Sequence, residues 1–228
     1  MTPGKRKNKN LIRACIFDLD GVIVDTAHYH YLAWKRLANA LGFDLTPDDN
    51  ERLKGVSRMQ SLEIVLQIGG ITANDEEKGL LADQKNGWFT VLIEQMKPDE
   101  IFPGVRELIE ELKAAGIKVA LASSSKNAPT VIERLGVRSL FEVIVDGTMV
   151  AHTKPDPEIF LSTAEKLGVP PSECVVFEDA EAGVEAALAA GMKCVGVGST
   201  ERLGKAHLVI ARTGEFSRKM LAHLETVK

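Results

Sequence analysis

Two aspartates, Asp18 and Asp20, are the first residues whose spacing could support chemistry, since they follow an apolar run and precede Gly21. Side chains two residues apart leave an extended backbone on the same side, so both carboxylates can converge beyond the end of a strand. Two acids this close repel each other unless a cation intervenes or one holds a proton, which indicates either Mg²⁺ or divided roles. For this pair alone, aspartates that only cap a helix or shape a turn are an equally good interpretation.

A second acidic pair, Glu178 and Asp179, follows another apolar run at residues 174–177. Parallel strands bring their carboxyl ends to one edge of a sheet, so three or four carboxylates would gather in one crevice. Such a cluster would be costly without a cation, and its oxygen ligands suit Mg²⁺, which also accepts phosphate oxygens. The second pair therefore favours a magnesium site over the turn interpretation.

Two further polar residues lie between the acidic pairs along the chain. Ser123 directly follows the run 118–122, and Lys154 precedes Pro155 in a loop-like stretch. Taken singly, such a serine is most often a helix cap and such a lysine a solvated charge. Together with the acids they complete a phosphoryl-transfer site, which needs a nucleophilic carboxylate, Mg²⁺, a hydroxyl donor and a fixed cation.

The elements that must position these residues alternate along the chain. Short β-rich runs are separated by helix-period stretches, which is typical of βαβ units around a parallel sheet. The predicted strands are 13–17, 118–122, 143–145, 174–177 and 194–197. The predicted helices are 104–115, 128–135, 158–167 and 181–190, and each of them is followed by a glycine. The sequence therefore predicts an α/β fold with a Rossmann-like parallel sheet flanked by helices.

Residues 27–97 break this alternation because they contain no convincing β run. Helical patterns at 29–41, 57–67 and 75–96 are separated by Gly42, the Thr46-Pro47 pair and Gly69-Gly70. We expect this segment to form a smaller helical cap, with hinges near 25–27 and 97–104. The core would then comprise residues 11–26 and 98–228, preceded by a basic N-terminal arm, residues 1–10, that we expect to be disordered.

Length and composition limit the possible functions. With 228 residues, of which 45% are hydrophobic and 26% charged, the chain can bury a core for one domain with an insert. A net charge of −4, the lack of a long apolar run and the lack of a secretory signal predict no nucleic-acid partner and no membrane association. Cys15, Cys174 and Cys194 lie in strand-like runs, so we expect buried, reduced thiols in a cytoplasmic protein. We also expect a monomer.

The order of these motifs resembles the haloacid dehalogenase (HAD) superfamily of phosphotransferases, which carries four motifs. The matching stretches are Asp18-Leu19-Asp20-Gly21, Ser123, Lys154-Pro155-Asp156-Pro157 and Glu178-Asp179-Ala180 with Gly183. The resemblance extends from Leu11 onward, and the helical insert after the first motif is similar to that superfamily's mobile cap. It implies a HAD core with an inserted α-helical cap domain.

Within that superfamily, the cap and the loops resemble the β-phosphoglucomutase family. This narrower resemblance rests on residues 17–30, Trp34, residues 54–58, Lys85-Asn86 and residues 122–127. It implies an enzyme that transfers a phosphoryl group within one substrate, interconverting β-D-glucose 1-phosphate and β-D-glucose 6-phosphate through β-glucose 1,6-bisphosphate.

The resemblance also implies a role for each catalytic residue. Asp18 would be the nucleophile that becomes an aspartyl phosphate, and Asp20 would be the general acid and base for the sugar hydroxyl. Ser123 and Lys154 would hold the oxygens of the transferring phosphoryl group. The implied Mg²⁺ ligands are Asp18, the main-chain carbonyl of Asp20, Glu178 and Asp179.

A mutase must also hold the phosphate that is not reacting. Arg58 in the cap suits this task because a guanidinium binds phosphate through two parallel hydrogen bonds. By the same resemblance, Thr26 and Lys85 would position Asp20, and His30 would contact Asp20 or the sugar. The remaining residues that we expect to contact the substrate are Trp34, Lys54, Gly55, Val56, Ser57, Ser125, Lys126 and Asn127.

Two other functions remain possible from the sequence. A HAD-type hexose-phosphate phosphatase would use the same Asp18 and Asp20 with water as the acceptor. A non-enzymatic binding protein would use the basic arm and an inherited fold, but the complete set of motif residues argues against it.

Overall fold

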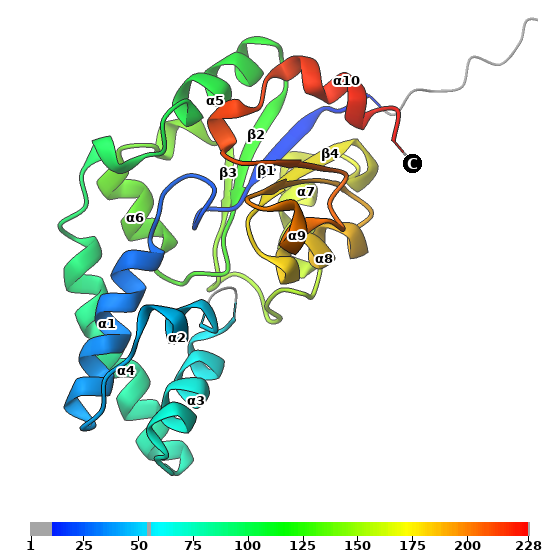
Figure 1. Ribbon diagram of the computed structural model, residues 1–228. Helices are drawn as coiled ribbons and strands as arrows, with labels where there is room; N and C mark the ends of the chain where they lie inside the picture. Colours follow the sequence, from blue (N-terminus) through cyan, green and yellow to red (C-terminus); the bar gives the residue numbers. More distant parts are fainter. Residues whose placement is uncertain (1–10, 54–55, 228) are drawn as a thin grey trace, which may run out of the picture.

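The computed structural model describes residues 11–53 and 56–227, so the predictions made for residues 1–10, Lys54 and Gly55 lie outside the described residues. Its centre is a six-stranded parallel sheet with the strand order β3-β2-β1-β4-β5-β6 (Figure 1). The strands are β1 (Ala14–Phe17), β2 (Lys118–Ala122), β3 (Val143–Val145), β4 (Cys174–Glu178), β5 (Lys193–Val197) and β6 (Leu208–Ile210). β1 lies in the middle, between β2 and β4.

This sheet confirms the predicted fold class. The five predicted strands are all present, with boundaries that differ from the prediction by at most one residue. β6 was not predicted, because three residues are too few to show a period. It extends the sheet beyond β5 through the register pair Gly196 and Val209.

Helices cover both faces of the sheet, and the alternation of side chains along β1 explains how. Cys15 and Phe17 belong to a core formed with α5 (Val105–Ala114) and α6 (Ala128–Leu135). Ala14 and Ile16 point to the opposite face and pack with α7 (Glu158–Leu167) and α8 (Glu181–Ala189). Because both faces are buried, the strands are apolar throughout, as expected for a parallel sheet.

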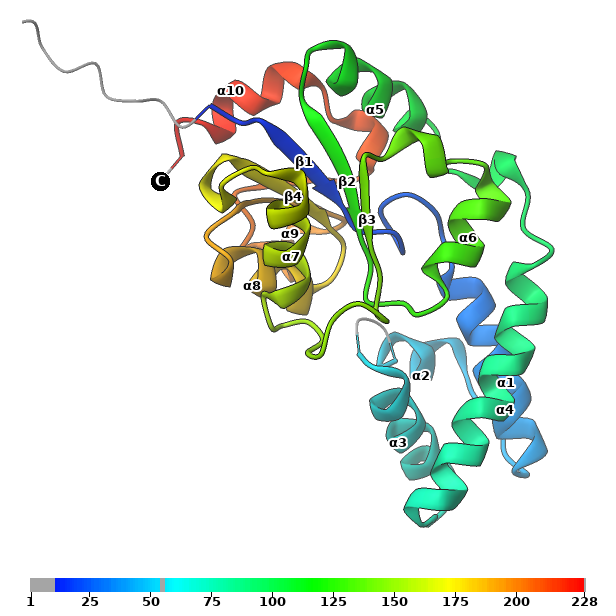
Figure 2. The same ribbon diagram turned by 180° about the vertical axis from the view of Figure 1, so that it is seen from behind.

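The segment between β1 and α5 is helical, and both views show it beside the carboxyl ends of the strands (Figures 1 and 2). Its helices are α1 (Ala27–Ala40), α2 (Pro47–Glu51), α3 (Arg58–Gly69) and α4 (Asp75–Ile93). They share a separate apolar core that includes Leu37, Leu62 and Val65. We refer to α1–α4 as the cap helices; the domain limits 27–97 stay a prediction.

The Thr46-Pro47 pair separates α1 from the following helices, as expected, but it also begins a helix that was not predicted. Thr46 is the N-cap of α2, with Pro47 in the first turn. The Thr46 hydroxyl accepts a hydrogen bond from the main-chain N–H of Asp49, and the Asp49 carboxylate accepts one from the N–H of Thr46. This reciprocal pair stabilises even a helix of five residues.

Two chain segments connect the sheet to the cap helices, and they run side by side. The main-chain N–H of Phe102 donates to the carbonyl of Ile23 at 2.9 Å, and Val24 forms a bridge with Ile101. The Tyr29 hydroxyl donates to a Glu100 carboxylate oxygen at 2.5 Å. The connection therefore behaves as a paired hinge rather than as two independent loops.

The other short elements lie around the sheet. They are α9 (Thr200–Leu203), α10 (Leu221–Leu224) and the 3₁₀ turns Pro98–Glu100, Arg138–Leu140, Pro171–Glu173, Thr213–Glu215 and Arg218–Met220. Cys15, Cys174 and Cys194 are buried and free. Among the described residues, no helix is long and apolar enough to cross a membrane.

Candidate active site

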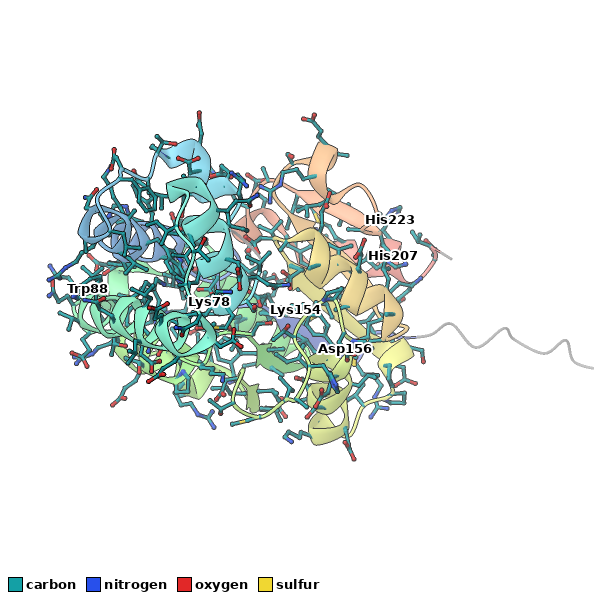
Figure 3. The ribbon with its side chains drawn as sticks, turned by 90° about the horizontal axis from the view of Figure 1, so that it is seen from below. Lys78, Trp88, Lys154, Asp156, His207 and His223 are labelled. Carbon is teal, nitrogen blue, oxygen red and sulfur yellow. The ribbon has the colours of Figure 1, made fainter. Side chains whose placement is uncertain are left out.

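A cavity of about 660 Å³, which we call the central cavity, lies between the carboxyl ends of the strands and the cap helices. Seen from below, Lys154 lies where the cap helices meet the sheet (Figure 3). The predicted site residues that line it are Asp18, Asp20, Thr26, His30, Trp34, Val56, Ser57, Arg58, Lys85, Ser125, Lys126, Asn127, Lys154, Glu178 and Asp179. Residues from both sides of the fold thus face one space.

Ser123 is placed differently from these residues. It is fully buried at the end of β2 and does not line the central cavity. Its hydroxyl accepts a hydrogen bond from the main-chain N–H of Ser125 at 3.1 Å, while its own N–H donates to Val145. In this arrangement Ser123 shapes the loop that follows β2, and the neighbouring Ser124 and Ser125 line the cavity.

The acidic residues gather around Lys154. The Lys154 Nζ donates to an Asp18 oxygen at 2.5 Å and to a Glu178 oxygen at 2.8 Å. All three side chains are more than nine-tenths buried. The strand register explains the meeting, because Phe17 pairs with Phe177 and the acids follow directly on adjacent parallel strands.

Two glycines allow the acids to approach their neighbours. Gly21 has a φ of +74°, and a Cβ atom there would lie 2.1 Å from Oδ2 of Asp179. A Cβ atom on Gly183, in the first turn of α8, would lie 2.0 Å from Cδ of Glu178. Any larger residue at either position would displace a carboxylate of the cluster.

Burial and mutual repulsion shift the pKa values of these acids. Burial, followed by the charge of Asp18, raises the pKa of Asp20 to about 7. Burial also raises the pKa of Glu178 to about 7 and that of Asp179 well above its usual range. For Lys154, burial alone would lower the pKa, but the charges of Asp18 and Glu178 outweigh burial and raise it. The cluster therefore resists carrying its full negative charge without a further cation.

A divalent cation fits the donor set. Oxygen atoms of Asp18, Glu178 and Asp179 lie within 4.8 Å of one another. Carboxylate oxygens in such a group are the ligands that hard divalent cations take. Burial and then repulsion between the acids raise the pKa values of Glu178 and Asp179, and a bound cation would offset both effects. These three residues therefore form the candidate metal centre.

Asp20 is held by the start of α1. Thr26, the N-cap residue of that helix, is buried, and its hydroxyl donates a short hydrogen bond to Oδ1 of Asp20. This contact fixes the carboxyl group of Asp20 at the cavity wall. With a pKa of about 7, Asp20 can hold or release a proton near neutral pH.

On the cap side, Lys85 is buried beside three rings. Its Nζ lies 2.8 Å from Nδ1 of His30 and 4.5 Å and 4.7 Å from the ring centres of Trp34 and Phe89. Burial, followed by the charge of Arg58, lowers the pKa of Lys85 to about 7. Burial, Lys85 and Arg58 lower the pKa of His30 well below its usual value. Lys85 can therefore lose its charge near neutral pH.

Arg58 and Asn127 bring further N–H donors to the central cavity. Arg58 begins α3, and burial lowers the pKa of its guanidinium while Asp83 partly opposes this. Asn127 is the N-cap residue of α6, and its side-chain N–H₂ donates to the side-chain oxygen Oδ1 of Asn86 on α4 at 3.0 Å. Ser125 accepts a hydrogen bond from the N–H of Asn127 at 3.2 Å. The loop 124–127 is thus joined to the cap helices.

Several lining residues were not predicted from the sequence. Asp25, Asn50, Met59, Asp83 and Arg202 face the central cavity, and Asn86 contacts it through Asn127. Helical spacing could have identified Asp83 and Asn86. Both lie on the same face of α4 as Gly79 and Ala82, which also line the cavity. Arg202 lies in the short helix α9 after β5, and no motif in the neighbouring sequence marks it.

The buried acids, Lys154 and the sheet edge they occupy define a phosphoryl-transfer enzyme of the α/β class. The chain belongs to the haloacid dehalogenase-like hydrolase family, whose model matches residues 12–191. The narrower comparisons point within that family to phosphoglucomutases and sugar phosphatases.

Two curated relatives represent these two groups. The chain is 45% identical to the β-phosphoglucomutase of Bacillus subtilis, over 92% of this chain and 94% of that protein. It is 38% identical to a phosphorylated carbohydrates phosphatase of Thermotoga maritima, over 86% of this chain and 90% of that protein. Both relatives therefore span nearly the whole chain, and the mutase is the more similar of the two.

Solved structures also include a β-phosphoglucomutase among those similar to this chain. The fold is similar to the crystal structure of β-phosphoglucomutase from Clostridium difficile, with a TM-score of 0.87 and 42% identity. The match covers 94% of this chain and 97% of that one. A second similar structure, CbbY from Rhodobacter sphaeroides in complex with xylulose-(1,5)bisphosphate, has a TM-score of 0.77 and 27% identity, over 90% and 96% of the two chains.

Proposed function

We propose that the protein is a magnesium-dependent β-phosphoglucomutase, interconverting β-D-glucose 1-phosphate and β-D-glucose 6-phosphate through β-glucose 1,6-bisphosphate. One observation carries the proposal. The central cavity combines the phosphoryl-transfer group around Asp18 and Lys154 with a separate set of anion-binding residues, Arg58 and Asn127. A substrate with two phosphates needs both. The 45% identity to the mutase of Bacillus subtilis supports the same activity.

Asp18 is the proposed nucleophile. One of its carboxylate oxygens attacks the phosphorus of the bisphosphate, and the bond from phosphorus to the sugar oxygen breaks. Lys154, whose Nζ lies 2.5 Å from an Asp18 oxygen, stays positively charged and holds the Asp18 side chain in place by their ion pair. The products of this step are an aspartyl phosphate and a sugar monophosphate.

Asp20 is the proposed general acid and base. It gives its proton to the sugar oxygen that leaves, and takes a proton from the other hydroxyl in the return step. Its pKa of about 7 suits both directions, because the acid and its conjugate base are both populated near neutral pH. The hydrogen bond from Thr26 keeps the Asp20 carboxyl turned toward the reacting oxygen.

Asp18, Glu178 and Asp179 would hold Mg²⁺, with the main-chain carbonyl of Asp20 as a further oxygen ligand. When bound, the ion would offset the negative charge of the carboxylates and of the transferring phosphoryl group. The part of this proposal that the chain itself supports is the close grouping of the three carboxylates.

The second group of residues would hold the phosphate that is not reacting. Arg58, Lys126 and Asn127 offer a guanidinium, an ammonium and an amide donor to that phosphate. Trp34, Val56 and Ser57 would surround the sugar, together with Lys54 and Gly55, which lie outside the described residues. His30 and Lys85 would act on the sugar or on Asp20 when the cap, residues 27–97, closes. Ser123 would support the phosphoryl site by shaping the loop 123–125.

The same proposal includes a cytoplasmic monomer that acts on a small sugar phosphate. Three buried free cysteines are compatible with a reducing compartment. Exclusion of water by the cap would decide between phosphoryl transfer to a sugar and hydrolysis.

The proposal is tested by supplying β-glucose 1-phosphate, Mg²⁺ and a trace of bisphosphate, then measuring glucose 6-phosphate and free phosphate separately. We expect glucose 6-phosphate to form with little phosphate release, and Asp18→Ala to abolish both. Arg58→Ala should impair isomerisation more than residual hydrolysis. The matched control is Arg52→Ala, an exposed cap arginine that does not line the central cavity.

Release of one phosphate per substrate without isomerisation would contradict the mutase and favour a sugar phosphatase, the activity named for the Thermotoga maritima relative. Turnover that survives Asp18→Ala would contradict Asp18 as the nucleophile of either enzyme. A parent protein with no turnover at all would favour the non-enzymatic alternative.

A further inference from the structure

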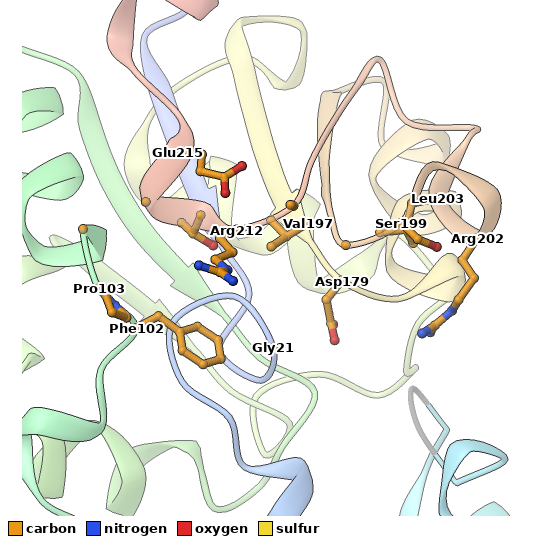
Figure 4. A pocket seen from close by; sticks show the side chains of 15 residues that line it. Gly21, Phe102, Pro103, Asp179, Val197, Ser199, Arg202, Leu203, Arg212 and Glu215 are labelled. Atoms are coloured by element: carbon orange, nitrogen blue, oxygen red, sulfur yellow. The ribbon is translucent and has the colours of Figure 1, made fainter. Parts of the chain in front are cut away.

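A second cavity, of about 720 Å³, lies on the other side of Asp179 from the central cavity. We call it the side cavity (Figure 4). Its walls come from the hinge residues 102–104, the loop after β5 and the loop after β6. It shares Gly21, Asp179 and Arg202 with the central cavity, so one thin wall separates the two. None of its lining residues belongs to the cap helices, so the core alone forms it.

The shape of the side cavity is set by a close main-chain contact. A Cβ atom on Gly214 would lie 2.2 Å from the carbonyl oxygen of Pro103, and one on Gly104 would lie 2.9 Å from Cα of Gly214. The Thr213 hydroxyl also donates to the carbonyl of Val22 at 2.7 Å. These contacts hold the hinge segment against the loop after β6, so the cavity has a fixed wall rather than a loose one.

Two arginines line the side cavity without protein partners. Neither the Arg202 nor the Arg212 guanidinium forms an ion pair or a side-chain hydrogen bond with any part of the chain that the structure describes. In the close-up, the Arg212 guanidinium points toward Phe102, whereas the Glu215 carboxylate points away from it (Figure 4). Both arginines are exposed, so a ligand can reach them.

Apolar side chains complete the cavity beside these charges. Phe102 is partly exposed in the wall, while Val197 and Leu203 are buried behind it. A guanidinium next to an aromatic ring offers both charge-assisted hydrogen bonds and a flat surface for stacking. Cavities of this size and composition, apolar with a few fixed polar groups, are typical of small-molecule sites.

We propose that the side cavity is a second ligand site, which binds a small organic anion that carries a planar apolar group. The phosphate, carboxylate or sulfonate of the ligand pairs with Arg212, with Arg202 as a second donor, and its planar group lies against Phe102. The bound anion lies next to Asp179, which belongs to the candidate metal centre. It also lies next to the hinge residues 102–104, which connect the core to the cap helices. The site does not depend on which phosphoryl reaction the central cavity performs.

The test uses 8-anilinonaphthalene-1-sulfonate, a planar sulfonate that becomes fluorescent in an apolar site. It is titrated into the full chain with saturating Mg²⁺ and glucose 6-phosphate, so that the central cavity is filled. We expect one saturable site whose affinity falls roughly fivefold to tenfold in Arg212→Ala, because one charge-assisted hydrogen bond at an accessible position is lost. Phe102→Ala should weaken binding as well.

The matched control is Arg134→Ala, which removes an exposed arginine that lines neither cavity and should leave the affinity unchanged. Equal affinity for the parent and Arg212→Ala would overturn the proposal, and so would a signal that glucose 6-phosphate abolishes. Arg212 lines only the side cavity, so its variant should keep the activity of the parent. If glucose 6-phosphate turns out not to bind, the comparison of Arg212→Ala with Arg134→Ala still decides the question.

Discussion

Replacing Gly21 with alanine should damage metal binding far more than folding. Gly21 has a φ of +74°, and its new Cβ atom would lie 2.1 Å from Oδ2 and 2.5 Å from Cγ of Asp179. The carboxyl group of Asp179 is the end of a side chain, so it can rotate away rather than unfold the protein. We therefore expect Gly21→Ala to fold while its Asp179 carboxylate leaves the candidate metal centre.

The magnitude of each effect can be worked out separately. An alanine in the left-handed region costs about 1–2 kcal/mol, and for a chain of this length that lowers Tm by about 2–8 °C. Mutating a residue that keeps a metal ligand in position typically weakens metal binding by about 10–100-fold. The loss of Mg²⁺ affinity should therefore exceed what the small loss of stability could explain.

Gly116 provides a matched control for the backbone cost. Its φ of +77° is close to that of Gly21, but a Cβ atom there would meet nothing within 4 Å. Gly116→Ala should lower Tm by a similar amount and leave Mg²⁺ affinity unchanged. Affinity is measured by calorimetric titration of each variant with Mg²⁺. If Gly21→Ala binds Mg²⁺ as tightly as Gly116→Ala does, the assignment of Asp179 as a metal ligand is wrong.

Three further predictions follow from the same site. Mg²⁺ at a hundred times its Kd should stabilise the folded parent by about 2.7 kcal/mol. In a thermal scan, Asp179→Ala should abolish most of the resulting rise in Tm. An equal rise in both proteins would show that the ion binds elsewhere. Burial raises the pKa of Asp20 to about 7, whereas an unfolded aspartate titrates near pH 4. Between these two pH values the folded state therefore binds more protons than the unfolded state. The contribution of Asp20 to stability falls as pH rises from about 4 to 7. In urea unfolding without divalent cations, the parent should therefore lose more stability over this range than Asp20→Asn, and parallel profiles would show that Asp20 titrates normally. Asn86→Ala removes the acceptor for the Asn127 amide. It should raise KM for the sugar phosphate about twofold to tenfold, with little change in kcat. An unchanged KM would show that this hydrogen bond does not position the loop 124–127.

The acidic cluster was predictable because topology alone brings it together. Asp18 follows β1 and Glu178 ends β4, and these strands are adjacent and parallel, with Phe17 opposite Phe177. Residues at the ends of neighbouring parallel strands must meet, whatever the loops do. Lys154 then joins these acids from a single loop, where it pairs with both Asp18 and Glu178. The sequence therefore contains most of what is needed to locate this half of the site.

The cap side was harder to predict because its geometry depends on how two independent helical layers pack. Arg58 and Lys85 were suggested by resemblance, and both line the central cavity, although their roles stay predictions. Asn86 was not assigned a role, since its hydrogen bond to Asn127 exists only once α4 lies against α6. Ser123 lies directly after β2, as the sequence predicted. Its burial could not be predicted, because it depends on the conformation of the loop that contains Ser125.

The distribution of charge in the central cavity explains why one nucleophile can serve both half-reactions. At the sheet edge, Asp18, Glu178 and Asp179 face Lys154, so this end accepts a phosphate only when a divalent cation offsets the carboxylates. Arg58 and Lys126 line the cavity from the cap helices and from the loop after β2, where the proposed mutase would hold a phosphate without activating it. Under the proposed function, a bisphosphate would react only at the sheet edge, and it would present its two phosphates there in turn. One nucleophile, Asp18, would then serve both ends of the sugar without a second catalytic group.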